Sequence, residues 1–423
     1  MLAKHSCWAL ALALAFTLPA AAQPVTEIVV QYPYGDVFKE THNRLAEEFA
    51  KTHPGIKVSF RAPYKDYEDA TQRILREAVT GTTPDITFQG LNRVRALADK
   101  QVAAPLDDFI KAETDFEAQG FHKAMRDAGS IGGKVYGLPF AVSLPIAYFN
   151  LDLVKAAGGD PAALPTSWDG VISLAAKIEG LRPGIHGIAA EWSISGNWLF
   201  QALVFENGGG MMDAGETKVA FDDAAGRKAI GTLARLVTET KTPNISGNDM
   251  RTAFAAGQVG VLLTTTAYVN AFTRQIGDRF TMKTSLFPGL TPGMSRLPAG
   301  GNVMMITAAS AEKRKAAWEV VKYWTGPRGG AAMVETTGYM APNAKAADHL
   351  ADFYKRNPNQ YTALAQLPYL TNWYAFPGDN GLKITDVIKD HLQSVMDGKR
   401  TAQANAVLSE MARDTQALLP AGK

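Results

Sequence analysis

Residues 26–88 read TEIVVQYPYGDVFKETHNRLAEEFAKTHPGIKVSFRAPYKDYEDATQRILREAVTGTTPDITF and alternate between strand-like and helix-like patterns. Apolar residues fill 26–30, as in a buried strand, and recur on one helical face across 37–52. The predicted elements are strand 26–30, helix 37–52, strand 56–60, helix 67–79 and strand 84–88. Because strands that alternate with helices in this way pair in parallel, we expect a doubly wound α/β lobe.

A second lobe is predicted after residues 135–150 (VYGLPFAVSLPIAYFN), which are extended, mostly apolar and contain two prolines. We interpret them as a crossing between lobes. Thr166 and Ser167 then cap a helix pattern at 168–178, with which the second lobe begins. Further predicted elements are helices 225–238, 249–256 and 311–324, strand 260–264, and two glycine- and proline-rich candidate crossings, 287–301 and 337–343.

The composition is that of an ordinary globular protein, with 423 residues, 46% hydrophobic and 20% charged. A chain of this length normally splits into two or more domains, because single cores stop growing at about 250–300 residues. The formal net charge is +2, and no basic block or basic–aromatic array is present. We therefore expect no nucleic-acid partner.

The first 22 residues have the pattern of a secretory signal peptide. Lys4 gives a basic start, residues 7–16 are apolar but too few to span a membrane, and alanines precede the expected cleavage after Ala22. The alternative is a frayed hydrophobic N-terminus. The only cysteine, Cys7, lies in this segment, so the mature chain would have no disulfide, catalytic thiolate or cysteine metal site. We expect export to the periplasm.

Seven short strings occur in a specific order along nearly the whole mature chain. They are 49–58 (FAKTHPGIKV), 81–86 (GTTPDI), 137–140 (GLPF), 148–150 (YFN), 165–169 (PTSWD), 254–257 (FAAG) and 337–343 (TGYMAPN). This ordered set resembles the extracellular solute-binding proteins, family 1, of ABC importers. The resemblance implies the type II periplasmic-binding-protein fold, in which two doubly wound α/β lobes are joined by crossing segments.

The resemblance also implies a function and a domain arrangement. The expected parts are signal peptide 1–22, lobe 1 at 23–138 plus 285–337, and lobe 2 at 139–284 plus 338–423. The protein would be a monomeric periplasmic receptor that closes on a carbohydrate, polyol or glycerol-phosphate-type solute. It would deliver that solute to the transmembrane permease of an ABC importer.

Within the family, the sequence most resembles the sn-glycerol-3-phosphate-binding branch. Residues 380–383 (NGLK) resemble the Gly-Leu-Arg stretch of that branch, with lysine in place of arginine. Lysine lacks the bidentate fork that arginine offers a phosphate. The paired tryptophans of the branch are represented here by Trp192 and the more distant Trp198.

Nine residues are predicted to contact the solute: Tyr34, Tyr64, Ser143, Trp192, Thr266, Gly301, Asn302, Tyr339 and Lys383. Aromatic rings suit the C–H faces of a sugar, and hydroxyls and backbone amides suit its hydroxyl groups. Tyr34 follows the first strand at its carboxyl end, where α/β sheets bind ligands. The alternatives are packing for the tyrosines, a helix cap for Thr266, a crossing turn for Gly301 and a solvated Lys383.

A secreted carbohydrate-active enzyme is the second hypothesis, and a structural or sensor role is the third. The sequence contains no Gly-x-Ser-x-Gly, P-loop or Gly-x-Gly-x-x-Gly motif, and its seven histidines are scattered. Adjacent carboxylates such as Asp107 and Asp108 point to different faces, although two carboxylates that face each other across a cleft stay possible. We expect no catalysis, no cofactor and no metal.

Overall fold

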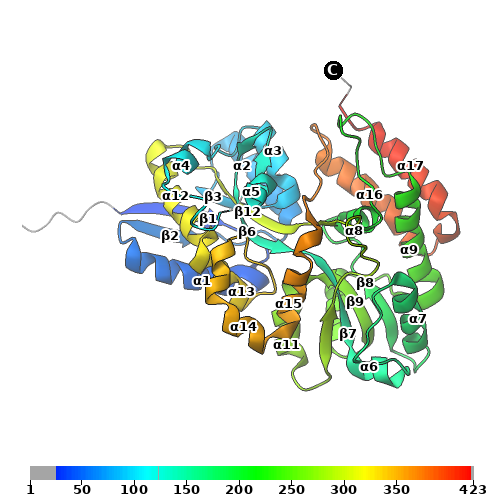
Figure 1. The fold of residues 1–423 in the computed structure, drawn as a ribbon. Coiled ribbons are helices and arrows are strands. Elements are labelled where there is room, and N and C mark those ends of the chain that lie inside the picture. The colour runs from blue at the N-terminus through cyan, green and yellow to red at the C-terminus, as the bar shows by residue number, and fades with distance from the viewer. Residues whose placement is uncertain (1–24, 122, 421–423) are drawn as a thin grey trace, which may run out of the picture.

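The computed structural model describes residues 25–121 and 123–420. The predicted signal peptide, with Cys7, lies outside the described residues. Two sheets, each packed with helices, form two halves that lie side by side (Figure 1). We refer to them as the first half and the second half.

The first half is built on a five-stranded sheet. Its strands, in spatial order, are β2 (Ile56–Phe60), β1 (Thr26–Gln31), β3 (Ile86–Gly90), β12 (Gly300–Ile306) and β6 (Leu138–Ser143). The pairings of β1 with β2 and with β3 are parallel, which confirms the prediction from residues 26–88. Strand β12 lies between β3 and β6 and runs antiparallel to both. A strand from residues 300–306 is therefore part of the same sheet as the strands from residues 26–90.

Capping residues set the ends of helices in the first half. The predicted helices appear as α1 (Gly35–Thr52) and α2 (Tyr67–Thr80). Asp66 caps α2 by accepting a hydrogen bond from the Asp69 amide at 2.8 Å, and Gly81 ends it at φ 69°, a conformation that glycine adopts without strain. The other helices are α3 (Val94–Asp99), α4 (Asp107–Ala112), α5 (Lys123–Ala128), α12 (Ala311–Thr325) and α13 (Pro327–Thr336).

The second half is built on a four-stranded sheet. Its strands, in spatial order, are β10 (Met282–Ser285), β7 (Pro145–Asn150), β9 (Val259–Thr265) and β8 (His186–Ala190). Strands β8 and β9 are parallel, and β7 is antiparallel to both of its neighbours. The helices are α6 (Leu151–Ala156), α7 (Trp168–Glu179), α8 (Trp198–Glu206), α9 (Ala224–Thr240), α10 (Gly247–Ala255), α11 (Val269–Ile276), α15 (Pro358–Ala365), α16 (Gly381–Met396) and α17 (Ala404–Gln416). The short helix α14 (Ala351–Arg356), which precedes α15, packs through Phe353 and Tyr354 against the core of the first half. The helices predicted near α7, α9 and α10 are confirmed.

The chain passes between the sheets where crossings were predicted. Strand β6 ends in the first sheet and β7 begins in the second, with only Leu144 between them. The second passage lies between β10 and β12, in the predicted crossing 287–301. Residues 338–340 also lie at the junction, because Gly338 donates to the Ala267 carbonyl and Met340 exchanges backbone hydrogen bonds with Val142. The exact lobe boundaries given above stay a prediction.

Candidate functional site

A cavity of about 490 Å³ lies between the two halves. From the first half its walls include Tyr34, Asp36, Lys65, Asp66, Tyr67, Glu68, Arg93, Ser143 and Tyr339. From the second half they include Glu191, Ser193, Ser195, Trp198, Arg251, Thr265, Tyr268, Trp373, Thr385, Asp386 and Lys389. Its volume lies in the range of about 300–1,000 Å³ that is usual for small-molecule sites.

Aromatic side chains form much of the wall. Tyr34 follows β1 and begins α1 in the left-handed conformation, at φ 55°. Its ring meets the Tyr67 ring edge to face, with centroids 5.0 Å apart. On the opposite side, the rings of Trp198 and Trp373 lie 6.1 Å apart. The cavity therefore offers flat apolar surfaces on both sides.

The tyrosine hydroxyls of the cavity stay protonated. Burial raises the pKa of Tyr34, Tyr67, Tyr268 and Tyr339 above the ordinary value of 10. Asn302 lies behind Tyr67 and donates a hydrogen bond to its hydroxyl at 3.2 Å. Each hydroxyl is therefore neutral near pH 7 and able both to donate and to accept a hydrogen bond.

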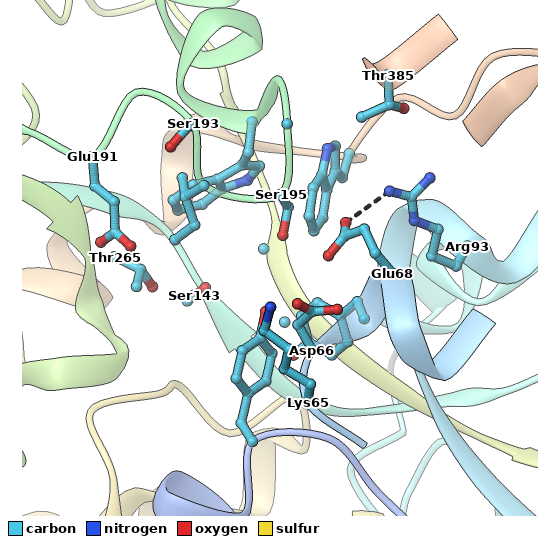
Figure 2. A pocket seen from close by; sticks show the side chains of 18 of the residues that line it. Lys65, Asp66, Glu68, Arg93, Ser143, Glu191, Ser193, Ser195, Thr265 and Thr385 are labelled. Carbon is cyan, nitrogen blue, oxygen red and sulfur yellow. Dashed lines mark hydrogen bonds and ion pairs between the residues drawn. The ribbon is translucent and has the colours of Figure 1, made fainter. Parts of the chain in front are cut away.

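Three cations of the cavity already have carboxylate partners. Arg93, which is 4% exposed, contacts Glu68 at 2.8 Å, and Lys389 contacts Asp386 at 2.9 Å. Arg251 pairs with the buried Glu191. Figure 2 shows Glu191 and the Glu68–Arg93 pair on opposite sides of the pocket. Both partners of each ion pair belong to the same half. Most of the charge on the cavity wall is therefore neutralised by a partner of opposite sign.

Glu191 is held in place by more than its ion pair. The Thr264 hydroxyl donates a hydrogen bond to its second carboxylate oxygen. The Arg251 guanidinium also lies 4.5 Å from the centroid of the Tyr268 ring. Among the described residues, Lys65 and Asp36 are the charged side chains of this cavity that form neither an ion pair nor a hydrogen bond through their side chains.

Four of the predicted ligand residues line the cavity: Tyr34, Ser143, Gly301 and Tyr339. They come from the end of β1, the end of β6, the start of β12 and the junction segment 338–340. These positions come from four separate segments of the chain, between residues 34 and 339, and the fold brings them together. Whether they contact the solute stays a prediction.

The other five predicted residues do not line the cavity. Tyr64 is buried, with its ring beneath the Arg73 guanidinium at 5.1 Å. Trp192 is buried in the core of the second half, and its indole donates to Asn244. Thr266 accepts a hydrogen bond from the Leu144 amide. Asn302 lies behind Tyr67, and Lys383 is exposed in the first turn of α16.

Sequence reasoning missed Glu68, Glu191, Arg251 and Trp373. Glu191 directly follows β8, and Thr265 is the last residue of β9. The rule that ligands bind at the carboxyl ends of strands could have identified both positions. Trp373 lies in the loop between β13 (Leu370–Thr371) and α16, a region for which no element was predicted from the sequence.

The structure shows no metal-binding cluster of three His, Cys, Asp or Glu residues within 25–121 and 123–420. Over the same residues, no helix combines the length and the apolar character needed to cross a membrane.

Comparison with known proteins gives a consistent result. The model of a family described as bacterial extracellular solute-binding protein matches residues 44–363. A putative binding protein of Brucella abortus is 24% identical over 434 residues, covering 96% of each chain. The sn-glycerol-3-phosphate-binding periplasmic protein UgpB of Escherichia coli K12 is 24% identical over 414 residues, covering 93% of each chain.

Solved structures share the fold. UgpB from Mycobacterium tuberculosis, in complex with glycerophosphocholine, superposes with a TM-score of 0.80 at 21% identity, covering 94% of this chain and 98% of that one. Maltose-bound MalE3 of T. maritima gives 0.79 at 20% identity, covering 93% and 100%. The predicted fold class is confirmed.

Proposed function

The chain belongs to the bacterial extracellular solute-binding protein family, and we propose that its cavity captures a carbohydrate or polyol for import. Members of this family bind solutes for ABC transporters and are not catalysts. The observation that carries the proposal is the cavity wall, which combines tyrosine and tryptophan rings with neutral hydroxyls from both halves. Rings pack on the C–H faces of a sugar, and hydroxyls match its hydrogen-bonding pattern.

Capture would occur by closure of the two halves. A solute that touches both walls, such as Tyr34 on one side and Trp373 on the other, binds the closed form better than the open one. The closed form would then be recognised by the membrane permease of the importer. We place this cycle in the periplasm and assign it to a monomer.

A glycerol-phosphate-type solute is the second candidate. It is favoured by the similarity to UgpB of Escherichia coli and by Lys65, a cavity cation without an ion-pair partner among the described residues. The paired state of Arg93, Arg251 and Lys389 favours the uncharged solute instead, because a phosphate would have to compete with existing carboxylates.

A thermal-shift screen of the purified protein tests the proposal. The panel contains neutral sugars, polyols, glycerol 3-phosphate and glycerophosphodiesters. Solute at a hundredfold excess over its Kd stabilises the folded state by about 2.7 kcal/mol. A shift with a neutral sugar or polyol supports the first candidate, and a shift with only the phosphate esters supports the second. Product formation from any glycoside or phosphodiester would contradict a pure binding role.

A further inference from the structure

The dipeptide Asn-Gly occurs twice in the chain, at Asn207–Gly208 and at Asn380–Gly381. Such a pair can react within itself, because the glycine amide nitrogen can attack the side-chain carbonyl carbon of the asparagine. Glycine favours this attack, since it has no side chain to block the approach and its backbone is little restricted. The structure places the two asparagines in different surroundings, and these surroundings predict different reactivity.

Asn207 is held in an unreactive arrangement. It directly follows α8, is partly buried, and its side-chain amide donates a hydrogen bond to the Leu203 carbonyl at 2.9 Å. The Gly208 amide, which would have to attack, donates to the Phe205 carbonyl at 3.0 Å. Both reacting groups are therefore hydrogen-bonded, and these bonds would have to break before the reaction could occur.

Asn380 is in a reactive arrangement. It is exposed and directly precedes α16, whose first residue is Gly381. The first amides of a helix have no partner inside that helix, and within the part of the chain that the structure describes the Gly381 amide donates no hydrogen bond. The attacking nitrogen is therefore available. The Asn380 side chain makes one contact, a hydrogen bond to the Leu418 carbonyl at 2.9 Å, which lies at the surface.

We propose that Asn380 is a site of spontaneous deamidation in the folded protein and that Asn207 is not. The Gly381 nitrogen bonds to Cγ of Asn380 and loses its proton to solvent, the bond between Cγ and Nδ2 breaks, and Nδ2 leaves as ammonia. The cyclic succinimide that results takes up a water molecule at either of its carbonyl carbons. Opening at one carbonyl gives aspartate and at the other isoaspartate. An amide and water thus become a carboxylate and ammonium, with no oxidation or reduction.

This modification would change the junction between the halves. Asp379 contacts Lys100 of the first half at 2.6 Å, and Leu382 and Thr385 of α16 line the cavity. Isoaspartate carries the main chain through its side-chain carbon, which lengthens the backbone between these contacts by a methylene group. Its carboxylate also cannot donate to the Leu418 carbonyl. The product should therefore separate Asp379 from Lys100 and weaken solute binding, a consequence that rests on the proposed function.

The test incubates the folded full-length protein at pH 8 for increasing times and follows its peptides by mass spectrometry. Deamidation replaces an amino group by a hydroxyl and adds the corresponding mass. We expect this gain in the peptide that contains Asn380, and about tenfold less of it at Asn207, because two hydrogen bonds must break there first. In urea both peptides should react at similar rates. Equal rates in the folded protein, or a faster reaction at Asn207, would overturn the proposal.

Asn380→Ser is the matched variant, because serine also suits the start of a helix but has no amide to lose. It should gain no mass at residue 380 and should keep its solute affinity through the incubation. The deamidated wild type, separated by its extra negative charge, should bind the solute found in the thermal-shift screen about two- to fivefold more weakly, as expected for the loss of an exposed ion pair.

The two readouts fail separately. Equal affinity of the deamidated wild type and of Asn380→Ser after incubation would disprove the effect on the junction. The mass measurement needs no solute, so a screen that finds no solute would contradict the proposed function and leave the predicted difference between Asn380 and Asn207 to stand or fall on the peptide masses.

Discussion

Arg95 on α3 lies 3.0 Å from Glu216, and this ion pair joins the first half to the second. The Tyr374 hydroxyl donates to the same carboxylate oxygen, also at 3.0 Å. One residue past the end of α3, Lys100 contacts Asp379 at 2.6 Å. The segment that carries Glu216 is itself held on the second half, because Gln416 of α17 donates to the Thr217 carbonyl. Two ionic contacts thus fasten α3 beside the cavity.

Glu216→Gln should weaken solute binding by about two- to fivefold. A partly exposed ion pair contributes on the order of 0.5–1 kcal/mol, and here that energy favours the arrangement in which both halves meet. The difference from wild type should shrink at high salt, because screening weakens the pair in the wild type. Titration at two salt concentrations measures both effects.

Glu239→Gln is the matched control for this prediction. It removes a carboxylate that pairs with Arg235 within α9, at 2.7 Å and with similar exposure, but that pair does not connect the halves. Its solute affinity should equal that of the wild type. If Glu216→Gln also binds like the wild type, the ion pair has no part in holding the halves together.

Glu206 should lower the free energy of unfolding as the pH rises. A carboxylate whose pKa is lowered by folding has the opposite effect. Burial raises the pKa of this carboxyl from 4.5 to about 7, although the Trp168 indole donates to it at 2.9 Å. Between these pH values the folded protein keeps a proton that the unfolded chain has released. The contribution of Glu206 to stability therefore falls as the pH rises from about 4.5 to about 7 and is constant above that.

The variant Glu206→Gln keeps a hydrogen-bond acceptor for Trp168 but cannot ionise. We expect it to match the wild type near pH 4 and to be more stable at pH 8, by on the order of 3 kcal/mol at most, since one pKa unit corresponds to about 1.4 kcal/mol. Urea unfolding across this pH range gives the difference. The exposed control Glu40→Gln should show no such trend, and a parallel pH profile for Glu206→Gln and wild type would disprove the raised pKa.

The fold could be predicted from the sequence because its signals are local. The alternation across residues 26–88 and the caps at Ser167 and Gly81 each involve neighbours in the chain. The antiparallel pairing of β12 with β6 in the first sheet had no such signal. Their pairing depends on segments more than 150 residues apart, and only the packed structure brings them together.

The site could be predicted only by region, as residues 264–266 show. The end of the strand was identified, but strand residues alternate between faces. Thr265 lines the cavity. The Thr264 hydroxyl instead donates a hydrogen bond to Glu191, and the Thr266 hydroxyl accepts one from the Leu144 amide. The tryptophans follow the same principle. Trp192 and Trp198 lie in the same short stretch of sequence, and only tertiary packing places Trp198 at the cavity, beside Trp373.

Two lysines of α16 should separate an anionic solute from a neutral one. Lys389 lines the cavity and pairs with Asp386 at 2.9 Å, whereas Lys383 is exposed and lies outside the lining. Lys383→Ala should therefore leave the affinity for every solute within twofold of wild type. Lys389→Ala leaves Asp386 without its cation, so it should weaken glycerol 3-phosphate more than a neutral sugar. A large loss of solute affinity in Lys383→Ala would instead show that Lys383 contributes to the binding site.

Tyr339 provides the most direct test of the cavity itself. It is 7% exposed and comes from the junction segment between the two halves, so its hydroxyl lies where the solute would touch both. Because burial raises its pKa, the hydroxyl remains a neutral donor throughout the working pH range. A buried hydrogen bond is worth about 0.5–1.5 kcal/mol, and Tyr339→Phe should therefore weaken binding by about two- to tenfold. Tyr361→Phe removes the same group from a side chain that is 58% exposed on α15 and should change nothing. Equal affinities of the two variants for the solute found in the screen would mean that the solute does not reach Tyr339, and the position of the binding site between the two halves would have to be abandoned.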